Sequence, residues 1–420
     1  MTLVKKPVTG MKDILPEEME IRDYLIGIIK EVYKSYGFTP IETPAVESIG
    51  NLISNQGGDN EKLIFRILKR GEKLRLEEGV SAEDISDIGL RYDLTLPLAR
   101  YYAANSAQLP SPFKAVQIGS VWRADRPQKG RYRQFTQCDI DIIGEAGALA
   151  EIELILATSA ALAKLCPKHR FKVRINDREI LRAMASYAGF AEEETEKVFI
   201  ILDKMDKIGK EGVQKELREA GCQASSIERY TELFESPDGG KEAADALMQR
   251  LGAALDSETK DRFLYIMDTV LSCSDSKFDL VFDPTLVRGM GYYTGTVFEV
   301  SMEGFSGSVA GGGRYDKMIG RFTGKDTPAC GFSIGFERII GILTDAGYRI
   351  PEVPEKIAYL YEKGIEKERI SAIIREASEE RKGGKQVLFA MMNKNKKFQK
   401  EQLKASGYTQ FKEFYKEALK

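Results

Sequence analysis

Histidine is almost absent from this sequence of 420 residues, and cysteine is scarce. The single histidine, His169, lies in the polar string Pro167-Lys168-His169-Arg170, which is more typical of an exposed loop than of a base or a metal ligand. The five cysteines are scattered without CxxC or any other ligand spacing, so the sequence indicates neither a zinc site nor a disulfide framework. We therefore expect no metal site built from protein motifs and no mechanism that depends on a histidine base.

Long apolar runs are also missing. The sequence has no run of about 18 apolar residues, the length that a membrane-spanning helix needs. The first ten residues, MTLVKKPVTG, lack the apolar core of a signal peptide. We therefore expect a cytoplasmic protein with no membrane partner, and the length predicts two or three domains.

The net charge of −2 hides an uneven distribution. Residues 356–420 contain 16 Lys and Arg against 9 Asp and Glu, a net charge of +7, which leaves −9 for the first 355 residues. The acidic bulk argues against indiscriminate binding of nucleic acid, whereas the basic C-terminal segment permits a local contact with phosphates. A basic surface helix would give the same count, so charge alone leaves both interpretations open.

The segment from Phe113 to Gly144 places two apolar runs on either side of the densest cationic stretch of the chain. We interpret it as a hairpin whose turn is Arg126-Pro127-Gln128-Lys129-Gly130. Two sets of apolar residues mark its strands: Val116, Ile118 and Val121 in the first, and Ile140, Ile142 and Ile143 in the second.

Charged and polar residues interrupt both strands of this hairpin, namely Arg123 in the first and Gln137, Asp139 and Asp141 in the second. Charges inside a sheet need partners, so Arg123 and Asp141 should face a polar cavity or each other. Such a cavity suits a zwitterionic or phosphorylated ligand, and Phe135 among arginines offers a face on which a nucleobase could stack. A solvated basic hairpin is the alternative interpretation.

The N-terminal part of the chain predicts a long helix followed by an extended piece. Pro16 stands near the first helical position, and apolar residues recur every three or four positions as far as Gly37, which we interpret as the stop. Phe38 to Pro44 is extended and bounded by prolines. Short strands at 62–66 and 89–95 then lead into a helix from Pro97 to Ala104.

The second half of the chain begins with a long helical region and continues with glycine-rich segments. Residues 177–274 are helical in pattern, and we expect an insertion there without a catalytic residue. Ala310 to Asp316 is interpreted as a glycine-rich loop that matches neither a P-loop nor a dinucleotide fingerprint. Gly331 to Ile340 joins a strand of small residues to an amphipathic helix that carries Arg338. A linker at 346–355 precedes a small α/β module at 356–420.

Four segments in order resemble the histidyl-tRNA synthetases, a family of class II aminoacyl-tRNA synthetases. They are GMKDILPEE with its helix, LRYDLT, the hairpin with WRADRPQKGRYRQFTQCDIDIIG, and LVRGMGYYTG through GFSIGFERI. The resemblance implies an α+β fold, with an antiparallel class II catalytic sheet flanked by helices. The expected domains are the catalytic domain at 1–345, including the helical insertion at about 177–274, and an anticodon-binding-like module at 356–420. The resemblance also implies a homodimer whose interface is built from the first helix and the strand after it.

The resemblance assigns roles position by position. Arg123 and Arg288 resemble the catalytic arginines, and Arg123 also holds the α-phosphate and the amino-acid carboxylate. The ATP-binding residues would be Arg123, Arg131, Phe135 and Arg338. The histidine-binding residues would be Asp93, Thr95, Gln137, Asp141, Arg288, Tyr292 and Tyr293.

The implied reaction is activation of L-histidine by ATP with Mg²⁺, followed by transfer to tRNA(His). Two other functions fit the resemblance: a non-catalytic histidine sensor similar to the regulatory subunit of ATP phosphoribosyltransferase, and a histidine-activating enzyme with another acceptor. Two departures bear on these alternatives. Gly291 replaces a carboxylate that many relatives carry, and no strand is evident after Gly407 to complete the shortened C-terminal module.

Overall fold

The computed structural model describes residues 3–53, 62–75, 79–128, 130–234, 239–274, 278–288, 291–305, 307–351 and 353–416. Lys129 of the predicted turn and Gly289 and Met290 of the RGMGYYTG motif lie outside the described residues. The chain forms two compact units, one of residues 1–13 and 25–347 and the other of residues 14–24 and 348–420. The domain limits expected from the sequence stay a prediction.

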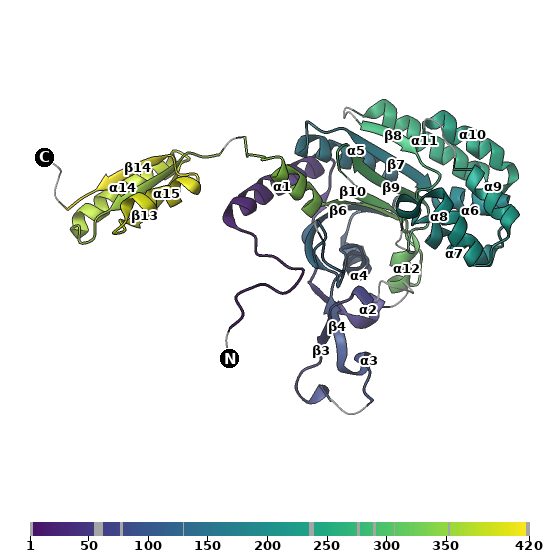
Figure 1. The fold of residues 1–420 in the computed structure, drawn as a ribbon, viewed down its shortest axis with the longest axis horizontal. Coiled ribbons are helices and arrows are strands. Elements are labelled where there is room, and N and C mark those ends of the chain that lie inside the picture. Colours follow the sequence, from purple (N-terminus) through teal and green to yellow (C-terminus); the bar gives the residue numbers. More distant parts are fainter. Residues whose placement is uncertain are drawn as a thin grey trace. The chain divides into compact units, whose positions relative to one another are not determined.

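The first unit is organised around a mixed sheet that, within the described ranges, has eight strands in the order β1-β5-β6-β11-β10-β9-β7-β8 (Figure 1). All neighbours pair antiparallel except β1 with β5 and β7 with β8. The predicted antiparallel sheet of an α+β fold is therefore confirmed. Its strands are β1 (Thr39–Pro40), β5 (Phe113–Trp122), β6 (Gln134–Ile143), β7 (Phe171–Asp177), β8 (Phe278–Phe282), β9 (Thr296–Met302), β10 (Ser308–Arg314) and β11 (Ala329–Gly335).

The predicted hairpin is confirmed as β5 and β6, which pair from Phe113 with Ile143 to Trp122 with Gln134. Arg123 follows the end of β5, so it lies just beyond the first strand and not inside it. Most apolar side chains of this hairpin are buried in the core, whereas Ile118, Trp122 and Phe135 are half-buried. Asp139 and Asp141 are buried as well. The interruption of the strand pattern therefore marks polar groups that the fold keeps away from water.

The interpretation of Ala310 to Asp316 as a loop was wrong, because most of this segment is strand β10. Glycine weakens an isolated strand, which is why the sequence suggested a loop. Here glycine is required because other atoms of the fold lie too close to the β10 backbone to leave room for a Cβ atom. A Cβ atom on Gly312 would lie 2.0 Å from the carbonyl oxygen of Gly331 in β11, and one on Gly311 would lie 2.3 Å from Nη1 of Arg288.

The predicted N-terminal helix is confirmed as α1 (Pro16–Ser35), and Gly37 follows it with φ of +82°. The helix predicted from Pro97 begins two residues earlier, at Thr95, where the buried carboxylate of Asp93 accepts a hydrogen bond from the Leu96 amide at 3.1 Å. The other helices that pack near the sheet are α4 (Thr95–Asn105), α5 (Leu149–Leu165), α12 (Lys317–Thr323) and α13 (Phe336–Asp345).

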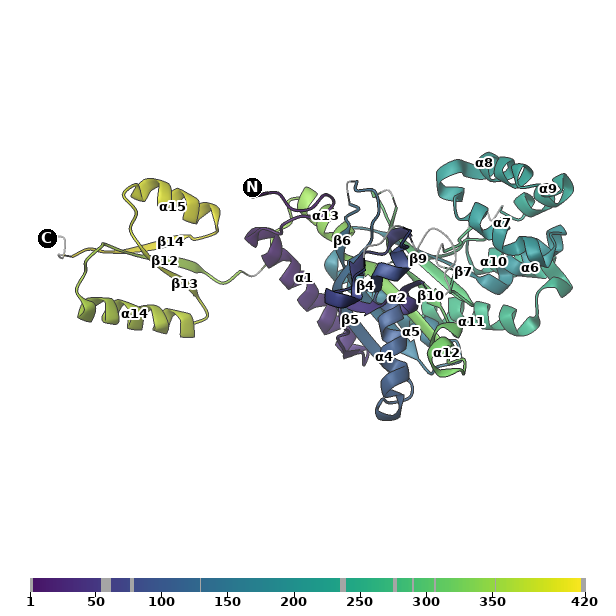
Figure 2. The ribbon, with the colours of Figure 1, turned by 90° about the horizontal axis from the view of Figure 1, so that it is seen from below.

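A group of helices connects the parallel strands β7 and β8 (Figure 2). Two parallel neighbours need a crossover, and this chain uses a long one. The secondary structure agrees with the helical pattern of the sequence, and whether the region is a separate insertion stays a prediction. Its helices are α6 (Arg178–Ala188), α7 (Thr195–Leu202), α8 (Met205–Glu219), α9 (Ala224–Glu232), α10 (Lys241–Leu251) and α11 (Ser257–Cys273).

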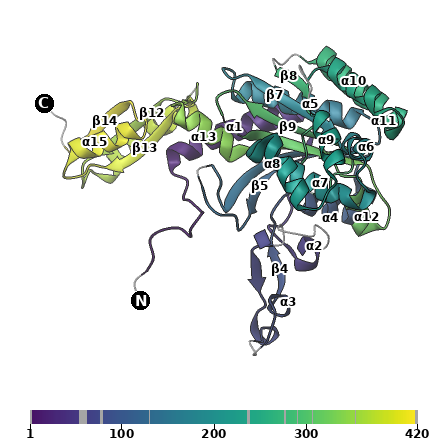
Figure 3. The same cartoon turned by 45° about the vertical axis from the view of Figure 1, so that its right-hand side comes forward.

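A second, smaller sheet of order β2-β4-β3 extends into an arm (Figure 3). Its strands do not coincide with the predicted ones at 62–66 and 89–95, because β3 begins at the last residue of the first segment and β4 ends near the start of the second. The elements are β2 (Val46–Ser48), α2 (Ile49–Ile53), β3 (Arg66–Leu68), α3 (Ala82–Ile85) and β4 (Ser86–Leu90).

The second unit contains a parallel sheet of order β13-β12-β14, with α14 and α15 on opposite faces (Figure 2). Strand β14 corrects the expectation that no strand follows Gly407. Its short, lysine-containing sequence QFKEF hid a strand whose Phe411 and Phe414 are only half-buried. The elements are β12 (Lys356–Tyr361), α14 (Lys367–Lys382), β13 (Gln386–Met391), α15 (Lys396–Ala405) and β14 (Gln410–Phe414). None of the helices in the described ranges is long and apolar enough to cross a membrane.

Candidate active site

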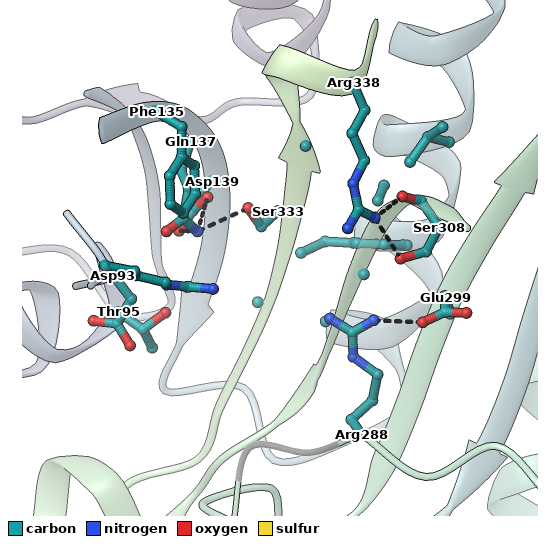
Figure 4. A pocket seen from close by; sticks show the side chains of 18 of the residues that line it. Asp93, Thr95, Phe135, Gln137, Asp139, Arg288, Glu299, Ser308, Ser333 and Arg338 are labelled. Carbon is teal, nitrogen blue, oxygen red and sulfur yellow. Dashed lines mark hydrogen bonds and ion pairs between the residues drawn. The ribbon is translucent and has the colours of Figure 1, made fainter. Parts of the chain in front are cut away.

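A cavity of about 430 Å³ opens over the central strands of the large sheet. All of the site residues predicted from the sequence line it, although they come from segments far apart in the chain. They are Asp93, Thr95, Arg123, Arg131, Phe135, Gln137, Asp141, Arg288, Tyr292, Tyr293 and Arg338. Six of them are labelled in Figure 4. The fold therefore gathers the predicted residues, while the role of each one stays a prediction.

Arginines occupy one part of this cavity. Arg123 donates from Nε to the carbonyl oxygen of Tyr92 at 2.9 Å, and its guanidinium lies 5.1 Å from the centre of the Phe135 ring. Phe135 lies on β6 with its ring half-buried, so arginine and aromatic ring present one continuous surface. Arg131 lies in the hairpin loop with half of its side chain exposed, 4.0 Å from Asp125.

Arg338 and Arg288 extend toward each other from different elements (Figure 4). Arg338, in the first turn of α13, donates from Nη1 to the carbonyl oxygen and the hydroxyl of Ser308. Burial lowers the pKa of Arg338, and the charges of Arg131 and Arg288 lower it further. Mutual repulsion of cations at a partly buried site favours an anionic ligand, which would relieve it.

Carboxylates occupy the other part of the cavity. Asp93 is 2% exposed, and burial raises its pKa to about 6, although the Leu96 amide and Arg123 oppose the rise. Asp141 is also 2% exposed and accepts a hydrogen bond from the Tyr315 hydroxyl at 2.6 Å. Its pKa is raised well above the ordinary value by burial and by the neighbouring Asp139. Each of these carboxylates keeps one buried oxygen, Oδ2, without a hydrogen-bond partner among the described residues.

Gln137 is held in one orientation by two neighbours. Its Nε2 donates to the carboxylate of Asp139 at 3.3 Å and to the hydroxyl of Ser333 at 3.1 Å (Figure 4). Both amide hydrogens are then used, so Oε1 is the atom left for a ligand, and it has no partner in the described structure. Gln137, Asp93 and Asp141 together offer three unsatisfied buried acceptors, which calls for a ligand rich in hydrogen-bond donors or positive charge.

Two tyrosines and a threonine complete the carboxylate end. The ring centres of Tyr292 and Tyr293 lie 4.8 Å apart, and Tyr315 meets Tyr292 edge-on at 6.1 Å. Both Tyr292 and Tyr293 are buried, and Thr95 begins α4 beside Asp93. Flat aromatic walls next to carboxylates suit a planar polar ring.

Asp139 is the main residue whose importance the sequence analysis missed. It is 3% exposed, and burial raises its pKa to about 7, against hydrogen bonds from Ser333 and Gln137 that lower it. Its position inside an apolar strand was a visible signal. Four further lining residues gave no such signal, because each is an ordinary polar residue in its own segment: Asp203, Glu299, Ser308 and Ser333.

Cysteine and histidine take no part in this cavity. His169 lies in a loop as expected, but it is half-buried and not exposed. The described cysteines are free thiols, and Cys273 is the exposed one. In the described part of the chain, no cluster of three His, Cys, Asp or Glu side chains could hold a metal ion.

Comparisons with known proteins agree with this geometry. A sequence model of the family described as "Histidyl-tRNA synthetase" matches residues 10–339. A curated relative from Leifsonia xyli subsp. xyli, named histidine--tRNA ligase, is 44% identical over 416 residues, which cover 96% of this chain and 94% of that protein.

Two solved structures share the fold. Histidyl-tRNA synthetase from Nostoc sp. PCC 7120 has a TM-score of 0.77 at 26% identity, over 97% of this chain and 90% of that one. An ATP phosphoribosyltransferase regulatory subunit/histidyl-tRNA synthetase from Bacillus halodurans has a TM-score of 0.78 at 22% identity, over 100% of both chains, and shows a likeness of fold alone. The family match over residues 10–339 and the 44% identity to a curated relative show that this chain belongs to the histidyl-tRNA synthetase family.

Proposed function

We propose that this protein is a histidine-tRNA ligase, which activates L-histidine with ATP and transfers it to tRNA(His). The observation that carries the proposal is the division of one cavity into two chemically opposite parts. One part holds three unsatisfied acceptors beside tyrosine rings, and the other holds arginines, of which Arg123 lies 5.1 Å from the centre of the Phe135 ring. An amino acid with a cationic amino group and a planar ring fits the first part, and a nucleotide fits the second.

The histidine would bind at the carboxylate end. Its α-ammonium group would meet Asp93, Thr95 and the Oε1 atom of Gln137, where unsatisfied acceptors are available. Its imidazole would donate a hydrogen bond to Asp141 and lie against Tyr292 and Tyr293. A buried acceptor left unpaired is costly, so a side chain without a donor at this position would be rejected.

The ATP would bind at the arginine end. Adenine would stack on Phe135, and Arg338 and Arg131 would contact the phosphates. Mg²⁺ would enter with ATP as part of the substrate and help to neutralise the phosphate charge. Arg123 lies against Phe135, and its charge opposes the rise that burial causes in the pKa of Asp93 and Asp139, so it is near both sets of groups. It would hold the α-phosphate and the histidine carboxylate together.

Adenylate formation at this site needs no protein nucleophile. The histidine carboxylate attacks the α-phosphorus, the bond to the β-phosphate breaks, and pyrophosphate leaves. Arg123 and Arg288 would stabilise the negative charge that spreads over the phosphorus, as fixed cations do in a preorganised site. The absence of histidine side chains from the cavity is no obstacle to this chemistry. The ribose hydroxyl of tRNA(His) would then attack the mixed anhydride and release AMP.

Two further features belong to the proposal. The protein would act in the cytoplasm as a homodimer, with α1 and β1 at the subunit contact, as the resemblance of this segment implies. The second unit, with its net basic segment, would contact the tRNA.

The proposal is tested by ATP-dependent attachment of labelled histidine to purified tRNA(His). We expect charging with histidine and none with other amino acids or with a tRNA of another identity. A histidine sensor would bind histidine and charge no tRNA, and an enzyme with another acceptor would form the adenylate without charging tRNA. Either of these results would overturn the proposed function in favour of the corresponding alternative.

A further inference from the structure

A chain of ion pairs leads from Arg288 to the helical region between β7 and β8. Nη1 of Arg288 lies 2.8 Å from Glu299 Oε2, and the other oxygen of Glu299 lies 3.2 Å from Nη1 of Arg174 (Figure 4 shows the first pair). Arg174 in turn contacts Asp283 at 2.6 Å and Asp206, at the start of α8, at 3.0 Å. Positively and negatively charged side chains therefore alternate along this series of ion pairs.

The sheet fixes the middle of this chain. Arg174 on β7 and Glu299 on β9 are direct partners in the strand register, and Glu299 is the partner of Gly311 on β10. The bare backbone of Gly311 leaves the space that the Arg288 guanidinium fills, since a Cβ there would lie 2.3 Å from Nη1. Arg288 is thus confined between one carboxylate and one glycine.

Burial makes these pairs depend on one another. The side chains of Arg174, Glu299 and Arg288 are 15%, 17% and 23% exposed, so each charge needs its partner. Burial lowers the pKa of Arg174, but Asp283 and Asp206 more than offset it and the pKa is raised overall. Asp206 is the exception, because 68% of its side chain is exposed.

We infer that Glu299, Arg174 and Asp206 are positioning residues, which hold the Arg288 guanidinium in place and make its position depend on the helical region. Asp206 and Arg174 do not line the cavity, so they act only through Glu299 and Arg288. The end of α7 points to the same connection, since Asp203 just beyond it lines the cavity. This inference rests on the proposed function, because it concerns the role of Arg288 in adenylate formation.

The first test is Glu299→Gln, which keeps the shape of the side chain and removes its charge. We expect single-turnover adenylate formation to slow by about 100-fold, the loss typical of a displaced catalytic group. The dissociation constant for histidine, measured without ATP, should change less than about threefold. Adenylate formation at the wild-type rate in folded Glu299→Gln would overturn the inference.

The second test uses Asp206, the exposed residue at the outer end of the series of ion pairs. A substitution there leaves the fold intact even if Glu299→Gln does not fold. Asp206→Asn should slow adenylate formation about threefold, in keeping with one exposed ion pair. The matched control is Glu232→Gln, since Glu232 is 60% exposed on the same helical region and pairs with Arg250 at 3.3 Å. The control should keep the wild-type rate, and equal rates in both variants would contradict the inference.

A double-mutant cycle separates positioning from a general structural effect. In an Arg288→Ala background, Asp206→Asn should have no further effect on the rate, because the group that it positions is gone. An undiminished threefold effect there would show that Asp206 acts by another route. A wild-type protein that forms no adenylate would overturn the proposed function, whereas normal wild-type rates with unaffected variants would overturn only the ion-pair chain.

Discussion

Three buried carboxylates, Asp93, Asp139 and Asp141, share one cavity with raised pKa values. Burial is the largest cause for each of them, and mutual repulsion adds to it for Asp139 and Asp141. A group whose pKa is higher in the folded than in the unfolded state stabilises the fold at low pH, and this contribution is lost as the pH rises through the folded pKa. These three carboxylates therefore lower the free energy of unfolding of the protein near neutral pH, relative to acidic pH.

Asp139→Asn tests this effect of burial. Between the ordinary pKa of 3.8 and the folded value of about 7, titration of Asp139 lowers the free energy of unfolding of the wild-type protein as the pH rises. The asparagine variant lacks this titrating group. We expect the variant to gain about 1 kcal/mol on the wild type per pH unit between about pH 5 and pH 6.5, without ligands. Urea denaturation across this range measures the difference. If the difference in free energy of unfolding between the variant and the wild type stays constant with pH, Asp139 is not the group that titrates in this range.

Two serines that contact different groups of the cavity provide a matched pair of substitutions. Ser333→Ala removes a partner of Gln137 and should raise the KM for histidine about five- to tenfold, the loss of one hydrogen bond, with little effect on ATP. Ser308→Ala removes a partner of Arg338 and should raise the KM for ATP instead. Steady-state exchange kinetics separate the two, and equal effects of either variant on both substrates would argue against the division of the cavity.

At the scale of single elements, the sequence predicted strands well where apolar residues alternate and poorly where glycine or charge replaces them. The hairpin β5–β6 and helix α1 follow from periodicity, because their buried faces are apolar. Strand β10 was hidden, since Gly311, Gly312 and Gly313 carry no side chain and are needed for tertiary contacts that only the fold reveals. Strand β14 was hidden by its lysine and its exposure.

Neighbouring glycines of β10 should therefore respond differently to alanine. Gly311→Ala would push the Arg288 guanidinium aside, so we expect adenylate formation to fall about 100-fold while the fold persists. Gly312→Ala would press on the backbone of β11 and should cost about 1–3 kcal/mol of stability or more. Thermal unfolding and single-turnover rates distinguish the two. A fully active Gly311→Ala variant would show that the position of the Arg288 guanidinium does not depend on glycine at residue 311.

For the whole molecule, the sequence identified eleven of the residues that line the cavity, because the resemblance covered four segments in order. The sequence could not supply the connection between Arg288 and Asp206, which are far apart in the sequence. The ion pairs of Glu299 on β9 and Arg174 on β7 link them. The distribution of charge, with +7 in residues 356–420, was visible from the start, although its partner was not.

The basic segment predicts a difference between the two half-reactions. Raising the salt concentration should increase the KM for tRNA steeply, since phosphate contacts release counterions, and should change histidine-dependent pyrophosphate exchange little. Aminoacylation and exchange measured over the same salt series make the comparison. Equal salt dependence of both reactions would mean that the tRNA contact does not rely on this segment.

The proposed function requires that one cavity bind histidine and ATP together and join them. Histidine-dependent exchange of labelled pyrophosphate into ATP, without tRNA and with other amino acids as controls, tests it most directly. We expect exchange with histidine alone, strongly reduced in Arg288→Ala although that variant still binds histidine. If folded wild-type protein binds histidine but catalyses no exchange, this cavity does not form the adenylate.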